Sequence, residues 1–148
     1  MKFENSVVID QPIKKVFEFV TNFENNPIWQ TDILEIQMTS EGPVRPGSTY
    51  RCVNRFMGKR FETESRITGY VPETLCSFKI ASGDITGESN FLFKAVNGGT
   101  RFTTVAELDL GFFKFAKMIV QHKINRQLKN DMSTLKKILE NGEHVKMS

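Results

Sequence analysis

The chain has 148 residues. Its 20 lysines and arginines outnumber its 17 aspartates and glutamates, which gives a formal net charge of +3. That length suits a single hydrophobic core, so we expect one domain over residues 1–148. Hydrophobic residues make up 39% and charged residues 25%, which excludes a disordered, collagen-like or disulfide-rich chain. The unusual feature is the number of phenylalanines, 13, beside 2 tyrosines and 1 tryptophan, which predicts an interior built mainly of phenyl rings.

No segment of the sequence indicates export or a membrane span. Residues 1–10 are too polar for a signal peptide, and residues 111–124, the longest candidate for a span, are interrupted by lysines and a histidine. Cys52 and Cys76 stand apart without a CxxC spacing, which favours small buried thiols in a reducing compartment. We therefore expect a cytoplasmic protein without stable membrane insertion.

The first thirty residues combine a strand pattern with two helix patterns. Residues 2–10 alternate apolar and polar side chains and predict a strand. Asp10 suits a helix N-cap, and Pro12 suits the first turn of the helix that follows. The apolar residues of segment 13–20 repeat at helical spacing, and a second short helix is expected over residues 23–30.

Six strand-like segments separated by turn residues follow. They cover residues 33–38, 48–56, 60–70, 74–81, 85–96 and 100–110. The connections are all short, which favours antiparallel pairing of consecutive strands. Asn97 and Gly98 are a strong hairpin signal, because both residues tolerate a positive φ.

A single long helix is predicted over residues 112–139. At about 1.5 Å per residue it would span about 40 Å, enough to cross a whole sheet. Most of its lysines and arginines lie off the apolar face, and a solvated surface explains them better than a phosphate contact, because no nucleic-acid motif accompanies them. We expect no nucleic-acid partner. The apolar stripe consists of Phe115, Ile119, Ile124, Leu128, Met132, Leu135 and Leu139.

The strand registers indicate which side chains face the interior. Charged residues mark the outer face of each strand, which leaves an inner face rich in phenylalanine. The inner face also contains a few polar residues, and polar groups on an apolar wall suit a ligand pocket. Ordinary core positions, whose hydroxyls bond to the backbone or to water, explain them equally well. The polar residues in question are Asn54, Thr63, Ser65, Ser89 and Thr104.

Few residues in this sequence suit catalytic chemistry. There is no glycine-rich phosphate loop, and we expect neither a metal site nor a cofactor. The weak candidates for proton transfer are His122 and Tyr50, joined by Glu62 and Glu64 if the strand register is shifted by one residue. In the unshifted register the two glutamates lie outside and pair with arginines of the neighbouring strand.

Five segments resemble motifs of the START-like superfamily, also called SRPBCC. Residues 8–17 (VIDQPIKKVF) resemble its opening, and residues 26–30 (NPIWQ) resemble its short-helix motif near the cavity. Residues 44–48 (VRPGS) resemble a strand entry, residues 98–102 (GGTRF) a hairpin and residues 128–140 (LKNDMSTLKKILE) the terminal helix. The motifs occur in the right order over nearly the whole chain, and the nearest subgroup is polyketide cyclase/dehydrase-like.

The resemblance implies an α+β helix-grip fold. In that fold a curved antiparallel sheet wraps around a long C-terminal α-helix, with two short helices after the first strand. The resemblance also implies an apolar cavity between the sheet and the long helix. Members of the superfamily bind lipids, hormones, polyketides or quinones, so the fold does not determine the function.

We expect the cavity to bind a small hydrophobic molecule, such as a lipid or a polyketide, without catalysis. The alternative is a polyketide cyclase or dehydratase, and the second alternative is a protein-interaction module that uses the basic helix. Neither the ligand's identity nor the oligomeric state follows from the sequence. The residues expected at the ligand are Trp29, Tyr50, Phe56, Phe61, Phe78, Phe91, Phe93, Phe102, Phe115, Ile119 and His122.

Overall fold

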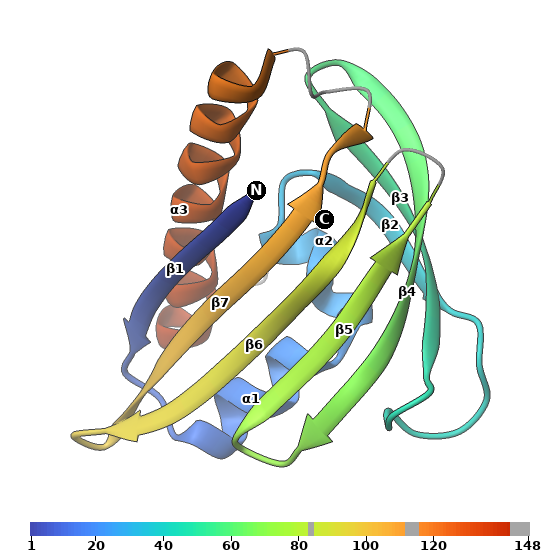
Figure 1. Ribbon diagram of the computed structural model, residues 1–148. Coiled ribbons are helices and arrows are strands. Elements are labelled where there is room, and N and C mark those ends of the chain that lie inside the picture. The colour runs from blue at the N-terminus through green and yellow to red at the C-terminus, as the bar shows by residue number, and fades with distance from the viewer. Residues whose placement is uncertain (83–84, 112–115, 143–148) are drawn as a thin grey trace.

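The protein is a curved antiparallel sheet that wraps around a long C-terminal helix (Figure 1). The computed structural model describes residues 1–82, 85–111 and 116–142. Its helical elements are α1 (Ile13–Thr21), the 3-10 helix η1 (Phe23–Asn25), α2 (Asn26–Trp29) and α3 (Lys117–Asn141). Its strands are β1 (Lys2–Ile9), β2 (Ile33–Met38), β3 (Thr49–Phe56), β4 (Lys59–Val71), β5 (Leu75–Ala81), β6 (Thr86–Val96) and β7 (Gly99–Asp109). This architecture confirms the predicted helix-grip fold.

The sheet has the strand order β1-β7-β6-β5-β4-β3-β2, so consecutive strands from β2 to β7 are neighbours and β1 joins the free edge of β7. Asn97 and Gly98 form the turn between β6 and β7 with φ angles of 46° and 83°. Two positive φ angles in a two-residue loop suit the right-handed twist of the strands. This confirms the predicted hairpin. Met57 and Gly58, with φ angles of 52° and 79°, make a similar turn between β3 and β4.

The register of β3 and β4 separates the two faces of the sheet as the unshifted reading predicts. On the outer face, Arg51 donates two hydrogen bonds to Glu62, at 3.1 Å from Nε and at 2.8 Å from Nη2. Cys52 and Thr63 pair across the same two strands and are buried on the inner face. Glu62 and Glu64 both lie on the exposed outer face.

The start of α1 differs from the prediction. The helix begins at Ile13 with Pro12 in the N-cap position, and no side chain caps it. Asp10 lies too far upstream, because Pro12 continues the extended chain at φ −60° and ψ 147°. The backbone N–H of Asp10 donates instead to Oε2 of Glu140 on α3 at 2.7 Å. The prediction that Asp10 is the N-cap was therefore wrong.

Helix α3 lies beside β1 (Figure 1). Near the C-terminal end of α3, hydrogen bonds join the helix to the N-terminal segment of the chain. Lys136 Nζ donates to the carbonyl of Val8 at 2.6 Å, and Gln11 Nε2 donates to the carbonyl of Leu139 at 3.0 Å. The predicted helix covered residues 112–139, of which residues 112–115 lie outside the described residues. None of the helices in the described segments is long and apolar enough to cross a membrane.

The apolar stripe of α3 begins at a different residue from the one predicted. Ile119 is 59% exposed, whereas Val120 is completely buried against Leu110. Val120 lies four residues before Ile124 and continues the helical repeat, whereas Ile119 lies five residues before it and faces a different direction. The placement of Ile119 on the buried stripe was therefore wrong.

The inner face of the sheet consists of two regions with different packing. What we call the packed half surrounds Phe93 and Phe102 and is covered by α1 and by Leu135 on α3. What we call the hollow half surrounds Ser89 and Thr104, further along the same strands. The cavity described below lies in the hollow half.

Candidate functional site

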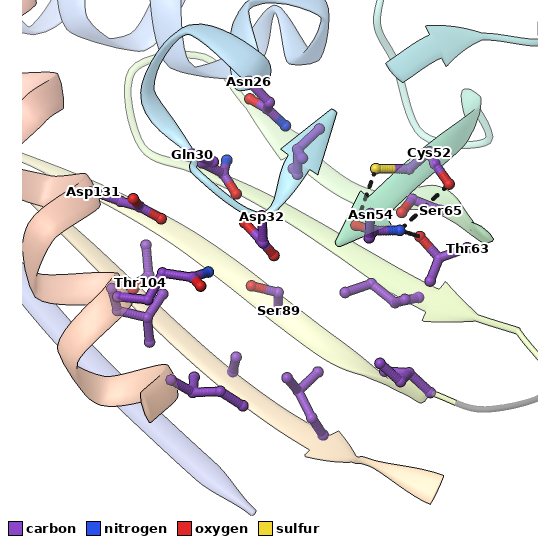
Figure 2. A pocket seen from close by; sticks show the side chains of 18 of the residues that line it. Asn26, Gln30, Asp32, Cys52, Asn54, Thr63, Ser65, Ser89, Thr104 and Asp131 are labelled. Atoms are coloured by element: carbon purple, nitrogen blue, oxygen red, sulfur yellow. Dashed lines mark hydrogen bonds between the residues drawn. The ribbon is translucent and has the colours of Figure 1, made fainter. Parts of the chain in front are cut away.

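The hollow half contains a cavity of about 210 Å³. Its walls come from the inner faces of β1 to β7, from η1, from α2 and the turn that follows it, and from the middle of α3. Figure 2 shows polar side chains on the walls of this space, where they come from the sheet, the turn and α3. An engineered apolar cavity of about 150 Å³ in another protein binds benzene, so the volume here accommodates a small organic molecule.

Apolar side chains form most of the cavity wall. Five of the residues expected at the ligand line it, and they come from α2, β3, β4, β5 and β6. Phe78 and Phe91 stand edge to face with ring centroids 5.1 Å apart, which is a favourable arrangement for aromatic pairs. The five residues are Trp29, Phe56, Phe61, Phe78 and Phe91.

Three expected ligand residues face inward but lie in the packed half. Phe102 is fully buried, and its ring stacks on Phe93 at 5.1 Å and lies 6.0 Å from Trp29. Phe93 in turn meets Phe17 of α1 edge to face at 4.9 Å. Tyr50 is 1% exposed and packs against the ring of Phe23 at 5.0 Å. The expectation that Tyr50, Phe93 and Phe102 line the cavity is corrected, because α1 and η1 fill the space above them.

Two expected residues of α3, Ile119 and His122, do not reach the cavity wall. His122 is exposed, as is Ile119, because both lie on the solvent side of the helix. Phe115 lies outside the described residues. None of the four weak proton-transfer candidates lines the cavity: Glu62 and Glu64 are on the outer face, His122 is exposed, and Tyr50 lies in the packed half.

One polar group on the sheet side of the cavity is satisfied by its neighbours. Asn54 donates from Nδ2 to the hydroxyl of Thr63 at 3.0 Å, and its Oδ1 accepts from the thiol of Cys52 at 3.4 Å (Figure 2). Burial raises the pKa of Cys52 to about 11, so this thiol is neutral and is a poor nucleophile. The Asn54 cluster therefore fixes the shape of the wall and supplies no reactive group.

The opposite side of the cavity contains two aspartates that sequence reasoning missed. Asp32 belongs to the turn between α2 and β2, and Asp131 belongs to α3 (Figure 2). The hydroxyl and the backbone N–H of Thr31 donate to Oδ1 of Asp131 at 3.2 and 3.3 Å. The carbonyl of Asp32 accepts from the backbone N–H of Arg55 at 2.8 Å, which ties the turn to β3.

Burial makes both carboxyls weaker acids than usual. Loss of solvent raises the pKa of Asp131 to about 7, with a further contribution from the nearby charge of Asp32, and the hydrogen bonds from Thr31 oppose this only in part. Burial likewise raises the pKa of Asp32 to about 6, opposed by its own backbone N–H and by a hydrogen bond from Gln127. Asp32 is only partly buried by surface area, because part of its surface lies on the cavity wall. Near neutral pH each of these carboxyls is therefore protonated in part of the molecules.

Two further buried polar atoms at the cavity have no protein partner. They are Oδ1 of Asn26 and Nε1 of Trp29, whose residues are 5% and 4% exposed. Both come from α2, the helix that precedes Asp32. A buried polar atom without a protein partner is costly, so each of these atoms is a candidate for a hydrogen bond to a water molecule or to a ligand.

A pattern in the sequence indicates Asp131 but not Asp32. Asp131 lies four residues before Leu135 and eleven after Val120, so it falls on the buried stripe of α3. A charged residue on an apolar stripe is a recognisable anomaly. Asp32 follows a short helix and faces inward because of the turn geometry, which no periodicity reveals. Among the described residues, no three His, Cys, Asp or Glu side chains gather as a metal site would require.

Comparison with known proteins identifies a family for this chain. The family model described as "Polyketide cyclase / dehydrase and lipid transport" matches residues 1–140. No curated protein sequence matches the chain.

Several solved structures share the fold at low sequence identity. TTHA0849 from Thermus thermophilus is 17% identical, with a TM-score of 0.79 over 97% of this chain and 99% of that chain. Ara h 8.0201 is 16% identical, with a TM-score of 0.65 over 92% of this chain and 95% of that chain. StfQ, a di-domain ARO/CYC from the steffimycin biosynthetic pathway, is 10% identical, with a TM-score of 0.74 over 95% of this chain and 51% of that one. The chain therefore belongs to the polyketide cyclase / dehydrase and lipid transport family.

Proposed function

We propose that this protein binds a small, mainly apolar organic molecule in the cavity of the hollow half and does not transform it. The observation that carries the proposal is the cavity of about 210 Å³ enclosed by aromatic and aliphatic side chains. Apolar walls with a few polar groups are typical of small-molecule sites. Burial of the ligand's apolar surface would supply the affinity, at about 25 cal/mol per Å² before the losses that accompany binding.

The chain contains a fluorescent residue whose signal can test this proposal. Trp29 is the single tryptophan, and it lines the cavity. We expect its fluorescence to change in a saturable way when the purified protein is titrated with probes that have a phenylethyl body, such as 2-phenylethanol. Mass spectrometry of molecules that co-purify with the protein would then identify the natural ligand.

A matched pair of variants on β7 tests whether the probe occupies the cavity. Ala106 lines the cavity, and Val105 is its neighbour on the opposite face of the strand. Ala106→Phe fills the space and is expected to weaken probe binding at least about tenfold. Val105→Phe adds the same ring outside and is expected to leave binding unchanged. Equal binding by both variants, or no saturable binding by the parent protein, would refute the proposal.

A second candidate function is a cyclase or dehydratase that acts on a polyketide-like substrate. The observation that favours it is the presence of Asp32 and Asp131 in one cavity, with pKa values raised to about 6 and about 7. Groups that titrate near neutral pH are efficient proton-transfer catalysts. Incubation with a short poly-β-ketone thioester would test it. A cyclised or dehydrated product whose formation falls at least about a hundredfold in Asp131→Asn would favour this function over simple binding.

A further inference from the structure

We propose that the ligand of this cavity carries a protonated amine, which is held between the carboxyl groups of Asp32 and Asp131. This inference rests on the proposed binding function and specifies the chemical class of the ligand. It distinguishes an apolar amine from an apolar alcohol and from a fatty or aromatic carboxylate.

The two carboxyls come from different parts of the fold and reach the same space. Asp131 extends from α3, and Asp32 extends from the turn between α2 and β2 (Figure 2). They are close enough for the charge of Asp32 to affect the titration of Asp131. Thr31 occupies Oδ1 of Asp131 with two hydrogen bonds, which orients this carboxyl.

No protein cation balances these carboxyls within the described part of the chain. The described residues that line the cavity include no lysine, arginine or histidine. The lysines and arginines described on α3 lie elsewhere. Lys136 pairs with Glu140 at 2.7 Å, and the exposed ones are Lys117, Lys123, Arg126, Lys129 and Lys137. Buried carboxylates are normally paired with a cation or neutralised. A cationic ligand would supply the missing partner.

Asn26 provides an independent indication of a hydrogen-bond donor on the ligand. Its Oδ1 is a buried acceptor without a protein partner, and Asn26 is one of the residues that line the same cavity. An ammonium group has three N–H donors and no acceptor. When ionised, the two carboxylates accept hydrogen bonds only, as does the amide oxygen, so above about pH 7 this side of the cavity is suited to donors and repels a carboxylate.

The titration of the site gives the proposal a pH dependence. An ammonium stabilises the ionised form of both aspartates, whose pKa values in the empty cavity are about 6 and about 7. The third titratable group on the wall is the Cys52 thiol on β3, which stays neutral because its pKa is raised to about 11. Amine binding is therefore expected to release protons near pH 6 and to strengthen as the pH rises from 5 to 8.

Three probes with one common body test the inference. They are 2-phenylethylamine, 2-phenylethanol and 3-phenylpropanoate, which share a phenylethyl group and differ in their polar end. We expect the amine to bind most tightly at pH 8, by about tenfold or more over the alcohol, and the carboxylate most weakly. Calorimetry in buffers of different ionisation enthalpy would measure the proton release.

Variants then assign the preference to the two aspartates. Asp32→Asn and Asp131→Asn keep the shape of the side chain and remove its charge, and each is expected to reduce the preference for the amine over the alcohol. Glu62→Gln removes a carboxylate from the outer face and is expected to leave the preference unchanged. The alcohol remains a fold control, because a variant that still binds it has an intact cavity.

The outcomes separate the two proposals. If the alcohol binds as tightly as the amine, or the carboxylate binds best, the amine inference is overturned and the binding function stands. If the amine preference survives in the double variant Asp32→Asn/Asp131→Asn, the assignment to the aspartates is overturned. If none of the three probes binds, the binding function and the inference fail together.

Discussion

The packed half and the hollow half of the inner face differ although they are built on the same strands. On β7, the fully buried Phe102 is followed at alternate positions by Thr104 and Ala106. On β6, Phe93 is preceded in the same way by Phe91 and Ser89. Over these positions the side chains therefore become smaller in the direction away from α1. Space for a ligand is left where the chain places small residues and where α1 no longer covers the strands.

The two halves also differ in what α3 contributes. In the packed half the helix provides Leu135 and Ile138, which are nearly inaccessible to solvent. One to two turns earlier, in the hollow half, it provides Asp131, Leu128 and Gln127 to the cavity wall. One helix thus completes a hydrophobic core with one segment and a polar binding surface with another. The comparison implies that stability and binding depend on different residues.

The largest difference is expected from two leucines of α3. Leu135→Ala removes a fully buried side chain from the packed half and is expected to lower the free energy of unfolding by about 3–4 kcal/mol. Leu128→Ala removes a half-buried side chain that already faces a cavity, and about 1 kcal/mol is expected. Urea unfolding of both variants measures the two values. Equal losses would contradict the division of the inner face into two halves.

A smaller, pH-dependent effect is expected from Asp131→Asn. Burial raises the pKa of Asp131 from 3.8 to about 7, so the folded protein holds a proton that the unfolded chain releases. Stability therefore falls as the pH rises from about 4 to about 7 and levels off above that range. The asparagine variant avoids this loss and is expected to be more stable than the parent at pH 8 by about 2 kcal/mol.

Thermal unfolding of Asp131→Asn and the parent at pH 4 and pH 8 measures this difference. At pH 4 the two proteins are expected to have similar stability, because the carboxyl is then protonated in the folded state. A stabilisation of the same size at both pH values would show that the gain does not come from the charge. That result would contradict the claim that burial in the hollow half destabilises the ionised form of Asp131.

The smallest effects are expected outside both halves. Glu62 pairs with Arg51 on the outer face, with side chains 59% and 43% exposed, and His122 is exposed on α3. Glu62→Gln and His122→Ala are each expected to change stability by less than about 1 kcal/mol and to leave probe binding unchanged. A loss of binding in either variant, measured by Trp29 fluorescence, would place the functional site somewhere other than the cavity.

Most of the fold could be predicted because it depends on local patterns. Alternation gives the strand faces, so Phe61, Thr63 and Ser89 were correctly expected on the inner side. Turn residues with positive φ, such as Asn97, gave the hairpins. Local patterns do not reveal which inward residues a distant helix covers. Tyr50 and Phe102 have the same alternation as cavity residues, and only the packing of α1 and η1 distinguishes them.

The acidic side of the cavity could not be predicted for the same reason. Asp32 and Asp131 are 99 positions apart, and their proximity depends on the packing of α2 and its following turn against α3. The prediction for Ile119 was wrong for a different reason. The buried stripe of α3 begins at Val120, one residue later than the sequence pattern was taken to begin. Val120 gives the correct phase and places Asp131 on the stripe.

Methyl NMR spectra recorded during titration with 2-phenylethylamine test the central claim most directly, because they report on both halves at once. A ligand in the cavity is expected to shift the methyl signals of Ala106, Ile80 and Leu128, which line it. The methyl signals of Val16, Ile67 and Leu135, which belong to the packed half, are expected to move little. Shifts concentrated in the second group, or no shifts in the first group at saturating probe, would contradict a ligand site in the hollow half.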